Sequence, residues 1–462
     1  MLLKGILKVQ KSLNMCEGPL FKKIIIFTVP IILTGILQLL FNAADLIIVG
    51  RFCGSNSVAA VGATSSLVNL IVNLFIGISA GTGVTVARAI GAGDEEYIKQ
   101  TVHTAIPTAI VSGLIVSILG FFVSGPMLNL MGVPKEILPL STTYLKIYFC
   151  GMLFSMVYNF GASILRAAGD SRSPLVFLTL AGVVNVILNI IFVTIFHLNV
   201  AGVAAATAIS QIISAVLVIM ALIKRTDACK LNLKKIRFIK RPLIAILSIG
   251  IPSGIQSSVF SLSNVIIQSS INSFGNIAMS GSAAAGNIEG FLYIILNSFY
   301  QTSLNFSGQN SGAGKFDRVK KIFSTCCLYV IVIGASLGSI TYLFGDKLLS
   351  IYLPNDPKAI EYGMIRFTYI LLPYFLCGLM EVATGSIRGM GSSFTTMIIS
   401  IIGVCVFRVV WIFTIFQYKP FHTFHGLFIS YPISWVLSFI VQLIAFRFVL
   451  KKRQRLYQKT WD

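Results

Sequence analysis

Twelve long apolar stretches dominate the sequence and limit what it can fold into. A scan with a window of about 19 residues finds stretches long enough to cross about 30 Å of hydrocarbon as helices. They lie near residues 24–50, 58–86, 102–124, 141–165, 174–197, 200–223, 243–271, 277–307, 322–344, 364–387, 394–416 and 424–448. We therefore predict an all-α polytopic membrane protein with twelve transmembrane helices.

The composition supports this class and excludes several others. Hydrophobic residues make up 56% of the chain and charged residues only 11%, and the mean hydropathy is +0.87. An average soluble domain is about 25% charged, so a cytosolic enzyme, a nucleic-acid-binding module and a secreted disulfide scaffold are excluded. The eight cysteines have no C-x-x-C spacing and are expected to be small packing residues. We expect no cofactor, no bound metal and no nucleic-acid partner.

The basic residues predict the orientation in the membrane. Of the 36 Lys and Arg residues, 28 fall at the termini and in the loops on one side, which predicts that this side is cytoplasmic. An even number of spans then places both termini in the cytoplasm. Seven others lie in loops on the opposite side, among them Arg366, and Arg408 lies within the eleventh stretch. The first apolar stretch is too long for a signal-peptide core, so we expect no segment to be removed.

A basic middle loop divides the chain. It carries eight Lys and Arg residues and one acid, and it separates two sets of six spans. The predicted parts are a cytoplasmic N-terminal segment (1–23), an N-lobe (24–223), a basic cytoplasmic linker (224–241), a C-lobe (242–448) and a basic cytoplasmic tail (449–462).

The two lobes carry matching motifs at nearly the same offset. Gly91-Ala-Gly93 corresponds to Gly312-Ala-Gly314, and the pattern R-x-x-G-x-S begins at both Arg166 and Arg388. Since six is an even number, the two copies insert in the same sense. Parallel repeats with a substrate path between them are typical of secondary transporters.

Three acidic residues lie within predicted spans: Asp45, Glu289 and Glu381. A carboxylate at the centre of a membrane helix costs about 2.5 kcal/mol or more, so it normally faces protein or an aqueous cavity and marks an ion or proton pathway. For the two glutamates the alternatives are a position at the membrane interface or an internal ion pair with Arg366, Arg388 or Arg408.

Asp45 has polar neighbours along the first helix. Helical spacing places Gln38, Phe41 and Asn42 on the same stripe, and Pro30 interrupts the backbone hydrogen bonds, so the helix can bend there.

Further polar side chains lie in the fifth and sixth spans. Asn185 and Asn189 are four residues apart and face the same way, and Thr207 lies at a similar depth. Each could line a site or simply form hydrogen bonds between helices.

Motifs for other energy sources and chemistries are missing. Gln309–Phe316 contains Gly-Lys but lacks the other residues of a P-loop, and there is no H-E-x-x-H sequence. The G-x-x-x-G spacings at Gly77/Gly81, Gly308/Gly312 and Gly334/Gly338 are explained by close helix packing.

The motifs together resemble those of a known family. Phe41–Arg51, preceded by Pro30, is similar to the first-helix signature of the MATE (multidrug and toxic compound extrusion) transporters. Val58–Gly62, Gly91–Gly93 and Ala284–Glu289 resemble the same family, as do the sequences around Arg166 and Arg388, so the likeness covers nearly the whole chain. The bacterial DinF-like branch is the most similar.

The resemblance implies two lobes around a central cavity and export of organic cations or amphiphiles in exchange for H⁺ or Na⁺. It assigns cation coupling or substrate binding to Asp45, Asn185, Asn189 and Thr207. Aspartate is commoner in the family at the position of Asn189, so this cluster has one carboxylate instead of two. We therefore expect H⁺ coupling, with Na⁺ at the Asp45 cluster as the alternative.

In the other branch of the family, acids of the seventh and tenth spans bind the cation. Here the seventh span has no acid, and Glu381 lies about a turn from the usual place, with Glu289 as a supplement. The expected mechanism is alternating access, in which a proton binds Asp45 and the first helix bends at Pro30.

The sequence is also compatible with two other functions. A flippase for lipid-linked saccharides would need several intramembrane Arg or Lys residues, and only Arg408 clearly lies within a span. A membrane-embedded lipid enzyme would need a polar catalytic cluster, which the four histidines do not form in sequence. The expected partners are a small organic cation or amphiphile and the lipid bilayer of a bacterial cell membrane, and we expect a monomer.

Overall fold

The computed structural model describes residues 12–354 and 356–458, and within these ranges it contains helices and no strand. The first six predicted spans are α2 (Leu20–Phe52), α3 (Ser55–Ala92), α4 (Glu95–Leu130), α5 (Leu138–Ala167), α6 (Arg172–Ile190) with the π-helical turn η1 (Ile191–Ile195), and α7 (Asn199–Lys224). The 3₁₀ turn η2 (Leu233–Lys235) follows in the middle loop.

The second half repeats this order with more interruptions. It consists of α8 (Lys240–Asn272), α9 (Asn276–Gly312), α10 (Phe316–Leu343), the short α11 (Gly345–Tyr352), α12 (Pro357–Arg366), η3 (Phe367–Leu371), α13 (Tyr374–Gly389), α14 (Ser393–Ser400), η4 (Ile401–Val406), α15 (Phe407–Phe413), the 3₁₀ turns η5 (Ile415–Gln417) and η6 (Lys419–Phe421), α16 (Phe424–Phe428) and α17 (Ser430–Gln458). The predicted all-α membrane fold is confirmed.

Ten helical segments of the described residues are long and apolar enough to span a membrane, and an eleventh is added if a bent pair counts as one span. That pair is Pro357–Leu371 and Tyr374–Gly389, which meet at 40°. The predicted span at 277–307 is the 37-residue helix α9, which is absent from the ten because its second half is rich in polar residues such as Ser303, Asn305 and Gln309. All twelve predicted stretches are thus helical.

The described chain forms two compact units. Unit 1 contains residues up to Asn14 together with Val29–Ser258, and unit 2 contains Met15–Thr28 and Val259–Asp462. The first nine residues of α2 therefore belong to unit 2, and the first nineteen of α8 to unit 1. These units are defined by spatial contacts, so they do not test the predicted division of the chain into an N-lobe and a C-lobe at the middle loop, which stays a prediction.

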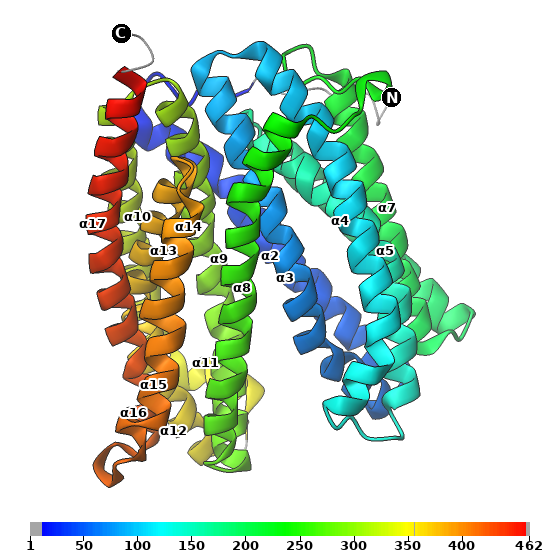
Figure 1. The fold of residues 1–462 in the computed structure, drawn as a ribbon. Coiled ribbons are helices and arrows are strands. Elements are labelled where there is room, and N and C mark those ends of the chain that lie inside the picture. The colour runs from blue at the N-terminus through cyan, green and yellow to red at the C-terminus, as the bar shows by residue number, and fades with distance from the viewer. Residues whose placement is uncertain (1–11, 355, 459–462) are drawn as a thin grey trace. The chain divides into compact units, whose positions relative to one another are not determined.

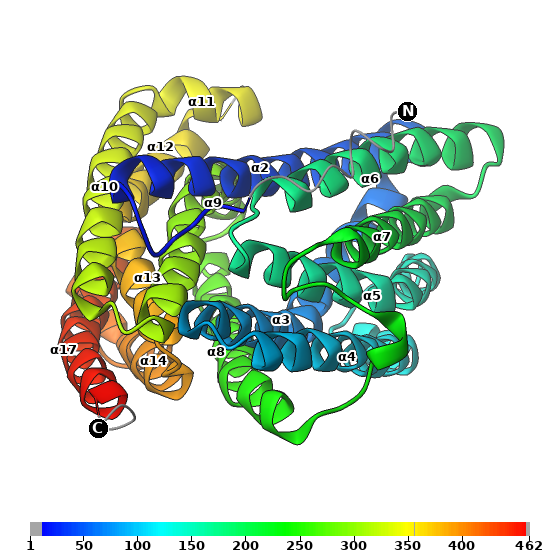
Figure 2. The same ribbon diagram turned by 90° about the horizontal axis from the view of Figure 1, so that it is seen from above.

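Unit 1 is built around α5, which packs between α4 and α7 (Figure 1). Its core is made of buried side chains from these helices, among them Val102, Phe160 and Val218. In unit 2, α13 packs against α9, α10 and α17, and Figure 2 shows α10 and α17 along one side of this group. Phe27 contributes to the core of unit 2 by an edge-to-face contact with Phe306, with ring centroids 5.5 Å apart.

Small residues let helices of unit 1 approach backbone to backbone. A Cβ atom added at Gly77 would lie 2.2 Å from the amide nitrogen of Gly254, and one at Gly81 would lie 2.2 Å from the carbonyl oxygen of Ile246. The predicted packing role of the Gly77/Gly81 pair is confirmed, because α8 presents its own glycines, Gly250 and Gly254, at this contact.

Left-handed glycines mark corresponding positions in the two halves. Gly93 and Gly314 both have a φ of 70°, and Gly169 and Gly391 have φ values of 90° and 85°. All four follow the end of a helix, where glycine reverses the chain at little steric cost. The matching motifs therefore have matching backbone conformations, as a duplication predicts.

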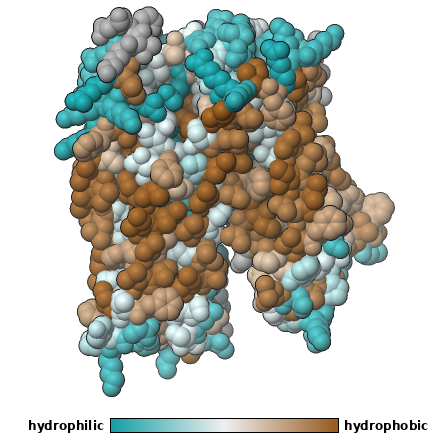
Figure 3. All heavy atoms as spheres, viewed as in Figure 1, coloured by the Kyte–Doolittle hydropathy of each residue, from teal (hydrophilic) through white to brown (hydrophobic). Residues whose placement is uncertain are grey.

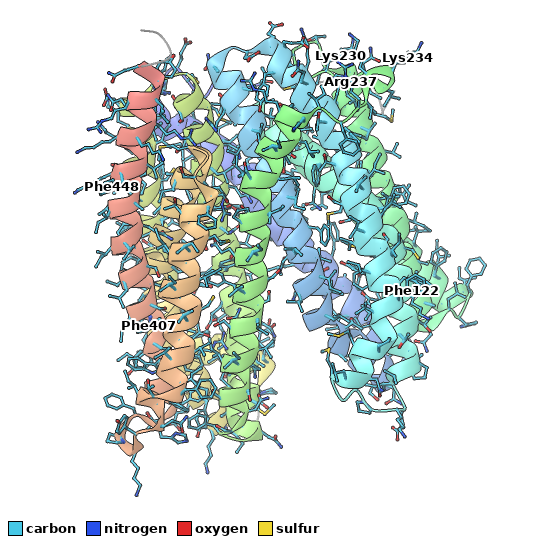
Figure 4. The ribbon with its side chains drawn as sticks, viewed as in Figure 1. Phe122, Lys230, Lys234, Arg237, Phe407 and Phe448 are labelled. Carbon is cyan, nitrogen blue, oxygen red and sulfur yellow. The ribbon has the colours of Figure 1, made fainter. Side chains whose placement is uncertain are left out.

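The outer surface is apolar where lipid would contact it. In the view of Figure 3, brown apolar side chains cover the middle of the helices and teal polar ones cover their ends. Phe122 of α4 is 71% exposed and Phe448 of α17 is 74% exposed, and both are labelled in Figure 4. So much exposed apolar surface is stable in lipid and not in water.

Candidate functional site

Four polar side chains from three helices of unit 1 form a connected cluster. The Asn189 amide of α6 donates a hydrogen bond to the Asp45 carboxylate of α2 and another, at 3.3 Å, to Asn185 Oδ1. The Asn185 amide donates in turn to Thr207 Oγ1 of α7, also at 3.3 Å. We call Asp45, Asn185, Asn189 and Thr207 the Asp45 cluster; the structure brings these four predicted residues together.

The orientation of the Asn185 amide affects the hydrogen bonds to Asp45. In the flipped orientation its nitrogen lies 2.9 Å from Asp45 Oδ1, and its oxygen accepts from the Thr207 backbone amide at 3.3 Å. The hydrogen-bond network determines which of the two amide orientations is adopted. In either orientation Asn185 hydrogen-bonds to another residue of the cluster. Asp45 is within reach of two amides.

Asn189 carries an unused acceptor. The residue is fully buried, and its Oδ1 atom has no hydrogen-bond partner among the described residues. A buried oxygen without a partner is unfavourable unless a proton donor, a cation or water satisfies it. The cluster can therefore accept one more positively polarised group next to Asp45.

The charge of Asp45 lacks a basic partner in the part of the chain that the structure describes. There its carboxylate forms no ion pair with a Lys or Arg. Next to the polar side chains of the cluster, Ile48, Val49, Val193 and Val203 form a buried apolar group about one turn away. A carboxylate in such a place needs a proton or a small cation to become neutral.

A close contact between α2 and α6 positions the cluster. A Cβ atom at Gly182 would lie 1.9 Å from Cε2 of Phe41, so only glycine admits this ring. Gly182 lies one turn before Asn185 and Phe41 one turn before Asp45, so this contact sets the distance between the two helices at the cluster.

The two other polar residues predicted on the Asp45 stripe are not part of this hydrogen-bonded network in the described chain. Gln38 and Asn42 are exposed, and neither hydrogen-bonds to the cluster within residues 12–354 and 356–458. Of the three side chains predicted beside Asp45, the one that meets α6 is Phe41.

Sequence reasoning missed Tyr144 of α5. Its ring packs against the buried apolar group that contains Ile48 and Val49, about one turn from Asp45. Tyr148, one turn further on, stacks on it with ring centroids 6.1 Å apart. The pair of tyrosines four residues apart within a span was the available signal.

Pro30 lies within α2, which is one continuous helix from Leu20 to Phe52. Its repeat counterpart is Pro252 within α8, at the offset that relates Arg166 to Arg388. Pro252 was not singled out from the sequence, although this offset would have found it. Each proline removes one backbone hydrogen bond from its helix, which makes both helices easier to bend.

Glu289 forms an ion pair in unit 2. Arg366 Nε and Nη2 donate to its two carboxylate oxygens at 2.8 and 2.7 Å, and Arg366 Nη1 donates to Ser282 Oγ at 2.7 Å. The alternative interpretation of Glu289 as an internal ion pair matches this geometry. The prediction that Arg366 lies in a loop is wrong, because it ends α12 and is largely buried in this pair.

Glu381 of α13 is half-buried, and no ion pair involves it among the described residues. Arg388, two turns further along α13, donates to the Tyr300 hydroxyl at 2.5 Å. Arg408 is buried with its guanidinium carbon 3.8 Å from the centre of the Tyr431 ring, and its Nε donates to Ser434 Oγ at 3.0 Å. Within the described ranges, the predicted alternative pairing of Glu381 with an arginine is therefore not formed.

The second repeat has no equivalent of the Asp45 cluster at the corresponding sequence positions. At the offset that relates Arg166 to Arg388, Asp45 corresponds to Ile267 and Asn189 corresponds to Trp411. Within the described residues, no group of three His, Cys, Asp or Glu side chains could hold a metal ion. The arrangement can bind a proton or a small monovalent cation at one carboxylate.

Comparisons with known proteins match nearly the whole length of the chain. The family model described as MatE matches twice, over residues 30–191 and 252–414. The two matches begin at corresponding positions of the repeat, Pro30 and Pro252. The chain is 27% identical over 437 residues to "Probable multidrug resistance protein YoeA" of Bacillus subtilis (strain 168), covering 93% of this chain and 94% of that protein.

Other relatives and a solved structure give the same picture. The chain is 23% identical over 397 residues to "Multidrug export protein MepA" of Staphylococcus saprophyticus, covering 86% of this chain and 88% of that protein. A solved structure titled "Crystal structure of MATE in the bent conformation" superposes with a TM-score of 0.89 at 20% sequence identity, covering 97% of this chain and 99% of that one.

Proposed function

Because the chain belongs to the MatE family, as its motifs predicted, we propose that this transporter exports organic cations and other amphiphiles in exchange for protons. It is a multi-pass membrane protein and not an enzyme. The observation that carries the proposal is the Asp45 cluster: a membrane-embedded carboxylate that two amides can reach and that pairs with no Lys or Arg of the described chain. The relatives named for multidrug resistance and export support the substrate class.

Proton coupling is favoured by the number of carboxylates. Asn189 stands where a second acid would supply the other negative charge for a metal cation, and its amide donates to Asp45. One proton neutralises one carboxylate, whereas an ion-binding site for Na⁺ usually gathers several oxygen ligands. The cluster is therefore better suited to a proton.

Sodium coupling is the second candidate, and one observation favours it. The buried Asn189 Oδ1 atom has no hydrogen-bond partner among the described residues, so it could coordinate a cation together with Asp45 and Thr207. If Asp45 is protonated instead, its carboxyl can donate a hydrogen bond to Asn189 Oδ1 after the Asn189 amide rotates by about 180°. The two candidates predict different driving gradients.

The transport cycle we propose is alternating access. Proton binding removes the charge of Asp45, which lies beyond Pro30 on α2, and thereby changes how strongly this helix is held to α6 and α7. Bending at Pro30 then accompanies the release of substrate outside the cell. The same proposal places both termini in the cytoplasm, the protein in the bacterial cell membrane, and the working unit as a monomer.

The test uses the purified full-length protein in liposomes with an organic-cation dye. A proton gradient, a sodium gradient or neither is imposed on the wild type, on Asp45→Asn and on the control Asp346→Asn, which makes the same change at an exposed carboxylate of α11. Gel filtration and the thermal unfolding midpoint establish that each variant is folded. We expect dye movement with the proton gradient that Asp45→Asn abolishes and Asp346→Asn reduces by less than about twofold.

Each other result rejects a stated part of the proposal. Movement driven only by the sodium gradient replaces proton coupling with sodium coupling. Full activity of folded Asp45→Asn, with unchanged pH dependence, removes the role of Asp45. If no dye moves under either gradient, the proposed substrate class is wrong, and the flippase for lipid-linked saccharides becomes the favoured function.

A further inference from the structure

The segment that joins α7 to α8, which we call the linker (Arg225–Ile239), is fixed to unit 1 by the first turns of α4. The backbone amide of Asn232 donates to His103 Nε2 at 3.0 Å, and that of Ile239 donates to Thr104 Oγ1 at 3.2 Å. Leu231 of the linker is itself buried. A linker held in this way can present a binding surface without first losing much conformational entropy.

The linker carries positive charges that are not neutralised by any acid of the described chain. Four of its basic side chains are exposed, and among the described residues none of the four forms an ion pair: Lys230, Lys234, Lys235 and Arg237. In Figure 4 Lys230, Lys234 and Arg237 lie close together at one end of unit 1.

The nearby carboxylates are already engaged. Glu95 pairs with Lys99 at 3.3 Å, Glu96 accepts from the Gln100 amide at 3.2 Å, and Asp227 pairs with Arg225. Among the described residues, none of these acids forms an ion pair with Lys230, Lys234, Lys235 or Arg237, so the four exposed cations can attract an external anion.

A cavity lies between these charges and α4. Its volume is about 680 Å³, and its lining carries five cations and three acids, so that the cations are in excess: Lys99, Lys230, Lys234, Lys235 and Arg237 against Glu95, Glu96 and Asp227. This is within the range of small-molecule sites and is ample for a phosphate-containing headgroup. The charge of the lining favours an anionic one.

Apolar side chains are exposed among the cations. Leu233 is 58% exposed and Phe238 is 52% exposed, and each is next to a basic residue in the chain. The linker follows one membrane-spanning helix and precedes another, so it lies at the membrane surface. Exposed Leu and Phe side chains beside Lys and Arg are the composition of segments that insert at the boundary between headgroups and acyl chains.

We propose that the linker is a binding site for an anionic phospholipid. The headgroup phosphate contacts Lys230, Lys234 and Arg237 at the cavity, while Leu233 and Phe238 enter the acyl region. A free phosphate would bind the basic side chains but would not contact Leu233 and Phe238. A zwitterionic lipid would contact these two apolar side chains but would gain little affinity from the basic ones. This site is independent of the Asp45 cluster and of the proposed export activity.

The experiment measures lipids bound to the purified full-length protein in mild detergent by native mass spectrometry, with phosphatidylglycerol and phosphatidylcholine titrated separately. Variant K230Q/K234Q/R237Q removes three linker charges, and R237Q removes one. The control K451Q/K452Q/R455Q removes three charges from the end of α17. Variant L233S/F238S removes the apolar contact, and excess inorganic phosphate tests for a small-anion site.

We expect phosphatidylglycerol to bind at least about fivefold more tightly than phosphatidylcholine, and K230Q/K234Q/R237Q to lose most of this preference. R237Q is expected to lose part of it, L233S/F238S to weaken both lipids, and the α17 control to change binding by less than about twofold. Equal binding of the two lipids overturns the proposal, as does an equal loss in the α17 control. Displacement of phosphatidylglycerol by inorganic phosphate would identify a small-anion site instead.

Discussion

The Glu289–Arg366 pair shows how a costly residue is stabilised within a membrane helix bundle. The guanidinium binds both carboxylate oxygens and the Ser282 hydroxyl, so α12 is attached to α9 by three charge-assisted hydrogen bonds. Such a pair gains little over an apolar contact, but loss of one partner leaves a buried charge. It is a structural feature of unit 2 for which the sequence offered three interpretations.

Glu289→Gln is therefore expected to destabilise the protein by about 3–5 kcal/mol, because it leaves Arg366 without a counter-charge. Ser282→Ala removes one hydrogen bond from the same guanidinium and is expected to cost about 1.5 kcal/mol. The thermal unfolding midpoint of each purified variant in detergent checks this order. If Glu289→Gln unfolds at the same temperature as Ser282→Ala, the ion pair does not contribute as argued.

Asp227 in the linker gives a pH dependence outside the membrane. Partial burial acts to raise the pKa of its carboxyl, but the hydrogen bond and charge of Arg225 outweigh burial and hold the pKa below its ordinary value of 3.8. The folded linker thus binds fewer protons than the unfolded one in this range, and the stability that the pair supplies is present above about pH 4 and lost below it.

We expect hydrogen exchange at the amide of Cys229, which donates to Asp227 Oδ1 at 3.1 Å, to be equally protected from pH 8 to pH 5. Below about pH 4 the protection should fall, by no more than about fivefold, because a half-exposed pair contributes at most about 1 kcal/mol. The comparison is made after correction for the intrinsic exchange rate. Asp227→Asn should lack this fall; a fall of the same size in that variant would assign it to another group.

At the scale of helices, the approach of α3 to α8 depends on the absence of side chains. Gly77→Ala would place a methyl group 2.2 Å from the Gly254 backbone, and neither helix can yield locally, so we expect destabilisation of about 3 kcal/mol. Gly62→Ala in the same helix has nothing within 4 Å and should be neutral or gain up to about 1 kcal/mol in helix propensity. Thermal unfolding of both variants measures the difference, and equal midpoints would contradict the close contact.

The helices themselves followed from apolar length, but their interruptions did not. A hydropathy window cannot distinguish a regular helix from the π-helical turns at Ile191–Ile195 and Ile401–Val406, since it averages side-chain hydropathy and contains no information about the backbone hydrogen-bond pattern. Arg366 was counted with the loop residues because it lies at the edge of the predicted stretch 364–387, where hydropathy does not distinguish a buried charge from an exposed one. Its burial depends on Glu289, which is distant in the chain and which only the tertiary structure brings near.

At the scale of the whole molecule, the repeat and the polar residues made much of the site predictable. Spacing placed Asn185 and Asn189 on one face, while their meeting with Asp45 followed from the family resemblance and not from spacing. Tyr144 was missed because an aromatic residue in a span is ordinary by composition. A stripe on an isolated helix does not say which part of it a neighbour covers, so the sequence did not predict that Phe41 contacts α6 while Gln38 and Asn42 are exposed.

The duplication also makes an internal comparison available. Pro30 and Pro252 occupy equivalent positions in corresponding helices, but α2 carries Asp45 beyond its proline, and α8 has isoleucine at the corresponding place. If bending is coupled to ion binding, only the proline that shares a helix with the carboxylate should affect proton-driven transport.

We therefore expect Pro30→Ala to lower proton-driven dye export in liposomes by at least about fivefold, because the restored backbone hydrogen bond stiffens α2 between its first turns and Asp45. Pro252→Ala restores the same bond in α8 and should change the export rate by less than about twofold, with its dependence on the proton gradient intact. Both variants should unfold at or above the wild-type temperature, which separates a loss of transport from a loss of folding. An equal loss in the two variants would mean that the bend serves the general motion of both repeats and is not linked to the protonation of Asp45.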